Sequence, residues 1–131
     1  MQPHSLKPLG IGLIGAGKHG VRYAQHIVED IPQAELVAVC RRNRSAGDQL
    51  AATFGCRYHA TYDQLIADQN VDAIAIVVPP ALHGAIVAAA CRAGKHILIE
   101  KPFAVSVAEA QRISALIKAS SIRCMVAQTL R

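Results

Sequence analysis

The sequence predicts an α/β fold in which six parallel strands form a doubly wound sheet with flanking helices. Short apolar runs alternate from end to end with longer segments of helical periodicity, which is typical of strands joined by right-handed helical crossovers. Hydrophobic residues make up 52% of the chain and aromatic residues only 4%. Ala, Val, Ile and Leu must therefore fill the core, as in parallel sheets covered on both faces. A glycine-rich turn directly after the first apolar run is the third indication.

The elements are expected in strict alternation. The first apolar run, residues 9–14, is the first strand, and residues 18–30 carry apolar side chains at helical spacing. The run 72–78 is apolar after its first residue, so we expect it to be a central strand. The other expected strands are 35–40, 57–59, 96–99 and 122–126, and the other expected helices are 45–54, one that starts at 61, 81–93 and 106–119.

Two helix starts carry the spacing of a capping box. Thr61 stands three residues before Gln64, and Ser106 stands three residues before Glu109. In such a box the hydroxyl accepts from a backbone N–H, and the later side chain accepts from the N–H of the cap residue. Gly94 follows the expected helix 81–93, where a left-handed glycine commonly ends a helix.

The length of 131 residues suffices for one domain and not for two ordinary ones. We expect residues 1–8 to form an N-terminal tail and residues 9–131 to form the domain. The N-terminus lacks the apolar segment of a signal peptide, and no apolar stretch reaches the length of a membrane span. The four cysteines form no C-x-x-C pair, so no metal site is expected, and reduced thiols fit a cytoplasmic location.

The formal charge of +5 favours an anionic ligand. Most basic residues are scattered, and only Arg41-Arg42-Asn43-Arg44 forms a cluster. No aromatic residues interleave with them, as a groove for single-stranded nucleic acid would require. Nucleic acid is therefore not the expected partner.

The segment Gly15-Ala16-Gly17-Lys18-His19-Gly20 matches the dinucleotide fingerprint G-x-G-x-x-G. It follows an expected strand and opens an expected helix, which is the context that the fingerprint requires. Gly15 permits a tight turn, Gly17 lets the backbone approach a pyrophosphate, and Gly20 lets the helix pack closely on the strand. The pyrophosphate would lie at the helix N-terminus, where backbone N–H groups are free. The sequence thus predicts a Rossmann-like domain that binds a dinucleotide.

The end of the second expected strand indicates which dinucleotide. Proteins that bind NAD place an Asp or Glu there to accept from the ribose 2′-hydroxyl, whereas this chain reads Cys40-Arg41-Arg42-Asn43. A guanidinium pairs with a 2′-phosphate, which an acid would repel. We therefore expect NADP to be preferred, chiefly through Arg41 with Arg42 or Arg44 assisting, although NAD and a merely solvated basic loop remain open.

Two further turns lie at the same edge of the expected sheet. Pro79 and Pro80 follow the fourth strand, and His83 lies in the first turn of the next helix, where the dipole disfavours a positive imidazole. A neutral histidine beside a nicotinamide and an accidental exposed histidine are both compatible with this position. Glu100-Lys101-Pro102 follows the fifth strand, at the carboxyl end where doubly wound sheets bind ligands.

Together these motifs resemble the Gfo/Idh/MocA family, the glucose–fructose oxidoreductase and inositol dehydrogenase group. The resemblance covers nearly the whole chain, and its most specific part lies within residues 77–103. There the family's order and spacing are matched by Pro79, His83, Gly94-Lys95-His96 and Glu100-Lys101-Pro102.

The resemblance implies an NAD(P)-dependent dehydrogenase or reductase that acts on a carbinol or carbonyl carbon of a sugar, a cyclitol or a related compound. Lys101 is the implied catalytic residue, which would hydrogen-bond the reacting oxygen and stabilise charge on it. A lysine that only pairs with Glu100 is the structural alternative. The expected cofactor-binding residues are Gly15, Ala16, Gly17, Lys18, His19, Gly20, Arg41, Arg42, Pro79, His83, Glu100, Lys101 and Pro102.

Family members add a C-terminal domain that forms most of the substrate site, and we expect that domain to be absent from this chain. The chain is then the cofactor-binding half of an oxidoreductase, expected to be inactive alone, and an exposed domain interface would leave self-association open. Two other functions remain: a non-catalytic dinucleotide sensor, and a domain that binds another nucleotide, such as a nucleotide-sugar.

Overall fold

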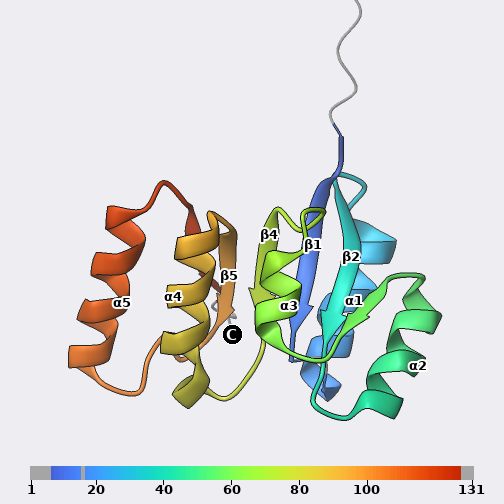
Figure 1. Ribbon diagram of the computed structural model, residues 1–131, viewed down its shortest axis with the longest axis horizontal. Coiled ribbons are helices and arrows are strands. Elements are labelled where there is room, and N and C mark those ends of the chain that lie inside the picture. The colour runs from blue at the N-terminus through green and yellow to red at the C-terminus, as the bar shows by residue number, and fades with distance from the viewer. Residues whose placement is uncertain (1–6, 16, 128–131) are drawn as a thin grey trace, which may run out of the picture.

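A computed structural model describes residues 7–15 and 17–127 of the chain. Its sheet has six parallel strands in the order β3-β2-β1-β4-β5-β6 (Figure 1), which confirms the doubly wound arrangement. The order reverses between β1 and β4, so the crevice beyond these two strand ends is the switch point where such sheets bind ligands. The strands are β1 (Leu9–Ile14), β2 (Ala34–Cys40), β3 (Arg57–His59), β4 (Ala73–Ile76), β5 (His96–Glu100) and β6 (Cys124–Ala127).

Helices cover both faces of the sheet. In Figure 1, α3 and α4 lie in front of the strands, α5 lies beside α4, and α1 lies behind β1 and β2. No helix in the described part of the chain is long and apolar enough to cross a membrane. The helices are α1 (Lys18–Asp30), α2 (Arg44–Phe54), α3 (Tyr62–Ala67), the short 3₁₀ helix η1 (Pro80–Leu82), α4 (His83–Ala93) and α5 (Val107–Ala119).

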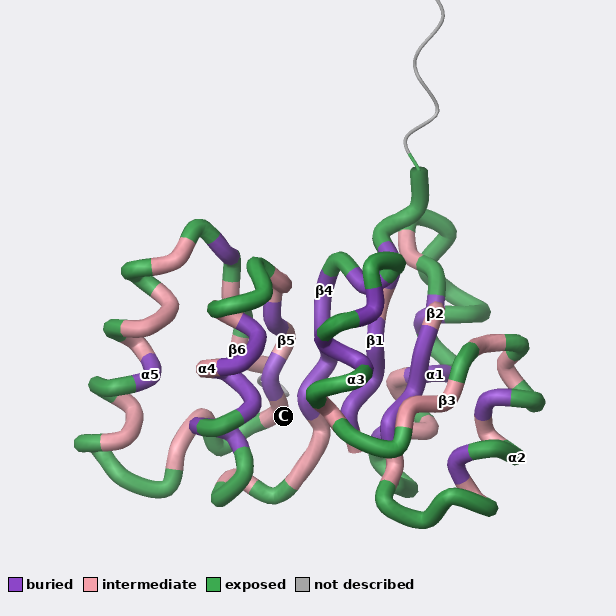
Figure 2. The backbone as a smooth tube through the Cα atoms, in the orientation of Figure 1, coloured by how far each residue is buried: buried purple, intermediate pink, exposed green. Residues whose placement is uncertain are grey.

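The core has two parts, one on each face of the sheet, and Figure 2 shows the buried residues concentrated in the strands and the inner sides of the helices. Alternate residues of β4 divide between them, since Ile74 and Ile76 pack in the larger cluster and Ala75 in the smaller one. All four residues of β4 are buried, which confirms the predicted central strand. This alternation is the two-residue period of a strand that is covered on both faces.

Most predicted boundaries are confirmed to within a few residues, and one of the larger differences lies at β4. Residues 72–78 were expected in that strand, but it spans only Ala73–Ile76. The carbonyl oxygen of Val78 lies 3.1 Å from Nε2 of His83 instead of joining the ladder. Because Pro80 then starts a 3₁₀ turn, the α-helix expected from residue 81 begins at His83.

Only one of the two capping boxes is complete. The Thr61 hydroxyl accepts from Gln64 N at 3.2 Å, and the Gln64 side chain accepts from Thr61 N at 3.4 Å. Ser106 accepts from Glu109 N at 3.1 Å, but the Glu109 side chain does not return to the cap. Its Oε1 is instead buried without a hydrogen-bond partner among the described residues, and it lies near Gly84 of α4.

Candidate dinucleotide-binding site

The turn between β1 and α1 has room only for glycine at two positions. Gly15 has φ +91°, and a Cβ built there would lie 2.1 Å from the carbonyl oxygen of Val77 at the end of β4. A Cβ on Gly20 would lie 2.2 Å from the carbonyl oxygen of Gly15. Both distances are far inside van der Waals contact, so these glycines let the turn and the helix pack directly on neighbouring backbone.

Gly17 differs, because a Cβ built on it would meet no other described atom within 4 Å. Gly17 is the N-cap of α1, and within the described residues no side chain caps the helix and its first turn holds no acidic residue. Free N–H groups and the positive end of the dipole therefore face open space beside the exposed Lys18. This arrangement fits the pyrophosphate of a dinucleotide. Ala16, also expected in the site, lies outside the described residues.

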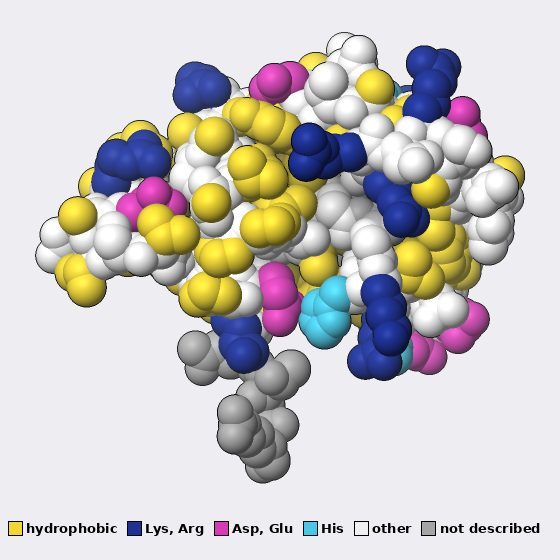
Figure 3. All heavy atoms as spheres, turned by 90° about the horizontal axis from the view of Figure 1, so that it is seen from below, with side chains coloured by type: hydrophobic (Ala, Val, Ile, Leu, Met, Phe, Trp, Pro, Cys, Tyr) yellow, Lys and Arg dark blue, Asp and Glu magenta, His cyan; other side chains and the backbone are white. Residues whose placement is uncertain are grey.

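A hollow of about 690 Å³ extends from this turn across the carboxyl ends of the strands. Figure 3 looks onto that edge and shows a group of hydrophobic side chains with Lys and Arg side chains next to it and elsewhere on the face. The hollow brings together five of the expected residues, namely Gly15, Gly17, Arg41, Arg42 and Pro79.

The same hollow is lined by residues that sequence reasoning did not identify. Thr61 caps α3, Tyr62 and Asp63 are the first residues of that helix, and Asn43 follows the arginines. The signal that could have found them is positional, because the turn after β3 must lie at the same sheet edge as the turn after its neighbour β2. Cys40 also lines the hollow, where burial raises the pKa of its thiol to about 11 and keeps it neutral.

The two arginines lie on a turn that is fixed from both sides. The Tyr58 hydroxyl donates to the carbonyl oxygen of Arg41 at 2.8 Å, and the Asn43 side chain caps α2 by accepting from Ala46 N at 2.9 Å. Arg44, which was expected to assist, lies in the first turn of α2 and forms an exposed pair with Asp48 at 3.8 Å. Arg41 and Arg42 are therefore the basic side chains that the hollow contains.

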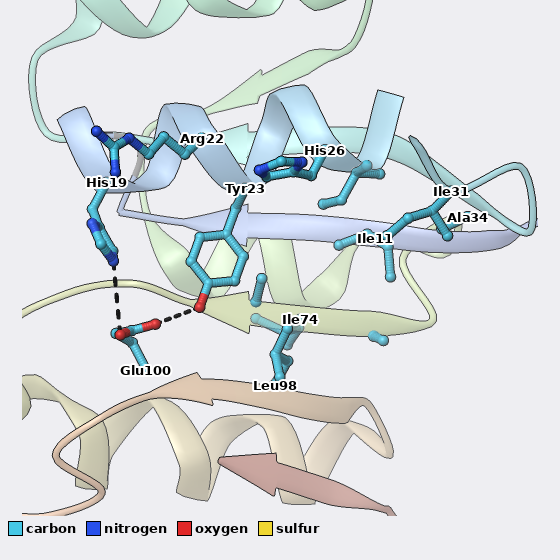
Figure 4. Close-up of a pocket in the computed structure, with 13 residues that line it drawn as sticks. Ile11, His19, Arg22, Tyr23, His26, Ile31, Ala34, Ile74, Leu98 and Glu100 are labelled. Carbon is cyan, nitrogen blue, oxygen red and sulfur yellow. Dashed lines mark hydrogen bonds and ion pairs between the residues drawn. The ribbon is translucent and has the colours of Figure 1, made fainter. Parts of the chain in front are cut away.

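Glu100 and His19 meet each other, but at a different hollow. Nε2 of His19 lies 3.7 Å from the Glu100 carboxylate, and the Tyr23 hydroxyl donates a short hydrogen bond to its other oxygen. All three side chains line a hollow of about 420 Å³ between α1 and strands β4 and β5 (Figure 4). Glu100 thus connects β5 to α1, a contact that the sequence did not reveal.

Lys101 directly follows β5, and its side chain is exposed. Among the residues that the structure describes, no ion pair joins Lys101 to Glu100. The structural alternative of a lysine that only pairs with its neighbour is therefore not supported. The Lys101–Pro102 peptide bond is cis, which the sequence did not predict.

His83 is enclosed in the protein, so the alternative of an exposed histidine is wrong. Its side chain is 0% exposed, with Nδ1 at 3.1 Å from the carbonyl oxygen of Phe103 and Nε2 at 3.1 Å from that of Val78. A neutral imidazole donates to one of these oxygens, and an imidazolium donates to both. Its ring connects the turns after β4 and β5, and it is not among the residues that line the 690 Å³ hollow.

Comparisons with known proteins agree with this geometry. The chain is 35% identical to a dTDP-3,4-didehydro-2,6-dideoxy-alpha-D-glucose 3-reductase of Streptomyces violaceoruber, over 83% of the chain and 32% of that protein. It is 30% identical to a scyllo-inositol 2-dehydrogenase (NAD(+)) of Bacillus subtilis, over 87% of the chain and 34% of that protein. A solved 3-ketoreductase from Actinomadura kijaniata, in complex with TDP-benzene and NADP, superposes with a TM-score of 0.84 at 28% identity, covering 92% of this chain and 38% of that one.

The chain therefore spans about a third of the length of the curated relatives that it matches. The family described as "Oxidoreductase family, NAD-binding Rossmann fold" matches residues 9–128. That range contains the glycine turn, the arginines after β2 and the turns after β4 and β5. The chain belongs to this family, the Gfo/Idh/MocA oxidoreductases, and has its NAD-binding Rossmann fold.

Proposed function

We propose that this chain binds NADP(H) in the 690 Å³ hollow and serves an oxidoreductase that acts on a sugar, a cyclitol or a related compound. The observation that carries the proposal is the junction of two anion-binding features in one hollow. The open glycine turn lies at one end, and Arg41 and Arg42 lie at the end of β2. In Rossmann domains a bound dinucleotide extends from its pyrophosphate to the 2′-position of its adenosine ribose along this same edge of the sheet.

The pyrophosphate would be held by backbone rather than by side chains. The open face of Gly17 allows close approach, and the free N–H groups at the start of α1 supply donors. Lys18 adds a positive charge at the same end of the helix. This part of the site is equally suited to NAD and NADP.

The preference between the two cofactors would come from the arginines. Charged hydrogen bonds from Arg41, assisted by Arg42, would stabilise a 2′-phosphate, and no acid follows β2 to accept from a 2′-hydroxyl. One charge-assisted hydrogen bond contributes about 1.5–3 kcal/mol, which corresponds to roughly ten- to hundredfold discrimination. The names of the relatives include both NAD and NADP. The proposed preference for NADP therefore rests on Arg41 and Arg42 of this chain.

The reacting end of the cofactor would lie beyond β4 and β5, near Pro79 and Lys101. The bound nicotinamide supplies or accepts a hydride. Lys101 is exposed at this edge, so its ammonium can hydrogen-bond the oxygen on the carbon that reacts and stabilise negative charge there. A hydroxyl that becomes a carbonyl would lose the proton of its oxygen to solvent and a hydride from its carbon, and the ammonium would stabilise the negative charge on that oxygen between the two losses.

The substrate class follows from the relatives. Those with named activities include a reductase of a dTDP-linked sugar and a dehydrogenase of scyllo-inositol. Both names describe the interconversion of a ring carbinol and a ketone, which is the reaction that Lys101 is suited to assist. We propose the same class of substrate for the oxidoreductase whose cofactor site this chain forms.

Fluorescence titration of the purified chain with NADPH and NADH tests the cofactor proposal. We expect NADPH to bind at least about tenfold more tightly, and replacing Arg41 and Arg42 by Ala to remove most of that preference. Arg92→Ala is the matched control, because it removes an exposed positive charge in the last turn of α4, away from the hollow. Equal affinities for the two cofactors in the unmodified chain would refute the NADP preference.

A further inference from the structure

Two side-chain contacts join α1 to the end of β5 across the width of another strand. The hydroxyl of Tyr23 donates to Oε2 of Glu100, 77 residues further along the chain. Nε2 of His19 lies 3.7 Å from Oε1 of the same carboxylate. Since β4 lies between β1 and β5 in the sheet, the Tyr23 side chain reaches over the end of β4 to make its contact, and His19 reaches over the segment that follows β4 (Figure 4).

The Tyr23 contact is the stronger of the two. The Glu100 side chain is 15% exposed whereas that of His19 is 60% exposed, so solvent screens the ion pair with His19. Glu100 lines the same hollow as the apolar side chains of Ile74 and Leu98, and a carboxylate that is largely shielded from water is destabilised without a donor. The neutral phenol is the stable form, because burial and the hydrogen bond to Glu100 raise the pKa of Tyr23 to about 12. Tyr23 is thus a hydrogen-bond donor at all ordinary pH values.

Glu100 immediately precedes Lys101, so whatever places the carboxylate also constrains the start of the following turn. The far end of that turn is tied separately, by the carbonyl oxygen of Phe103 at 3.1 Å from the His83 ring. Lys101 lies between these two anchors. The Tyr23 anchor belongs to α1, the helix whose first residues would hold the pyrophosphate.

We propose that Tyr23 is a positioning residue: its hydroxyl fixes the Glu100 carboxylate and thereby places Lys101 at a set distance from the glycine turn. The proposal rests on the proposed function and adds one contact to it: besides the substrate oxygen, the Lys101 ammonium hydrogen-bonds the nicotinamide end of the bound cofactor. A dinucleotide that is held by its pyrophosphate at α1 would then present its nicotinamide end to Lys101 in one arrangement. Tyr23 itself touches neither substrate nor cofactor in this role.

The test removes one hydroxyl and compares two ligands. Tyr23→Phe retains the ring that packs over β4 and removes only the hydrogen bond. We expect about three- to tenfold weaker binding of NADPH and unchanged binding of 2′-phospho-ADP-ribose, which lacks the nicotinamide. In a Lys101→Ala background the same change should cost no further NADPH affinity, because the group that Tyr23 positions is gone.

Tyr58→Phe is the matched control. It also removes one tyrosine hydroxyl that donates a hydrogen bond, to the Arg41 carbonyl oxygen at 2.8 Å. That bond lies at the adenosine end, so both ligands should be weakened equally. Glu100→Ala is a second variant, which removes the acceptor instead of the donor and should reproduce the effect of Tyr23→Phe.

Amide hydrogen exchange of the free chain gives a readout that needs no cofactor. Tyr23→Phe should speed exchange in the turn from Glu100 to Phe103, and Tyr58→Phe should leave it unchanged. Unchanged exchange in Tyr23→Phe, or equal loss of both ligands, would overturn the positioning role. If the unmodified chain bound neither ligand, the proposed function would fail, and the exchange rates would still decide whether Tyr23 holds the turn.

Discussion

Nδ1 of His83, the first residue of α4, lies 3.1 Å from the carbonyl oxygen of Phe103 in the turn after β5. Nε2 of the same ring lies 3.1 Å from the carbonyl oxygen of Val78 in the turn after β4. One enclosed side chain therefore joins the two turns that flank the reacting end of the proposed site. Carbonyl groups that leave a strand ladder need such a partner when they are shielded from water.

Replacing His83 by Leu should destabilise the fold. The change removes the ring that donates to at least one of two partly buried carbonyl groups, and we expect the free energy of unfolding to fall by about 2 kcal/mol. Urea denaturation followed by circular dichroism measures it. His26→Leu is the control, because His26 is 71% exposed and pairs only with Asp30 in the next turn of α1, and its effect should stay within about 0.5 kcal/mol. Equal losses in the two variants would contradict the bridging role of His83.

The stability of the fold should decrease in acid because of Asp68. Its carboxylate side chain is 3% exposed and is bonded by His59 Nε2 at 2.9 Å, by Asn70 N at 2.9 Å and by Arg57 at 3.2 Å. Burial alone raises the pKa of Asp68, but the hydrogen bonds from His59 and Asn70 and the charge of Arg57 outweigh it and lower the net pKa. The folded pKa thus lies below the unfolded value of about 4.

With a lowered folded pKa, the stabilising contribution is complete above the unfolded pKa and is lost as the pH falls through the folded one. We expect urea midpoints to drop below about pH 4. Asp68→Asn should lower the stability at neutral pH by about 2 kcal/mol and flatten this acid dependence. Asp48→Asn, which removes an exposed carboxylate from α2, should leave the slope unchanged. An Asp68→Asn variant with the original acid slope would refute the assignment.

Substitutions at two glycines of the turn should affect different properties: Gly20→Ala the stability of the fold, and Gly17→Ala the binding of the cofactor. Gly20→Ala places a methyl group 2.2 Å from the Gly15 carbonyl oxygen and should cost several kcal/mol of stability. Gly17→Ala meets no described atom within 4 Å, so its unfolding free energy should change by no more than about 1 kcal/mol. Its methyl group would nevertheless occupy the approach to the backbone, and NADPH affinity should fall at least about tenfold. Thermal melting and cofactor titration of both variants measure this contrast. A Gly17→Ala variant that binds NADPH as tightly as the unmodified chain would contradict it.

Features that depend on neighbouring residues in the chain could be predicted from the sequence. Thr61 and Gln64 form their capping box because both partners lie within one helical turn. The Gly15–Gly20 turn follows a strand and opens a helix as its spacing required. The second box is incomplete because the Glu109 side chain lies toward Gly84 of α4 and does not return to Ser106. Local spacing contains no information about a contact with another helix.

The sequence by itself determined the doubly wound sheet, the glycine turn and the two arginines after β2, because hydrophobic periodicity and glycine geometry act over a few residues. Only the tertiary structure decided that Tyr23 bonds Glu100, that His83 is enclosed between two carbonyl groups, and that the start of α3, with Tyr62 and Asp63, joins the arginines in one hollow. Each of these contacts depends on which strands are neighbours in the sheet. Tyr23 can reach across β4 to Glu100 only because of the strand order and the packing of α1 on the sheet. No short stretch of residues encodes either of these.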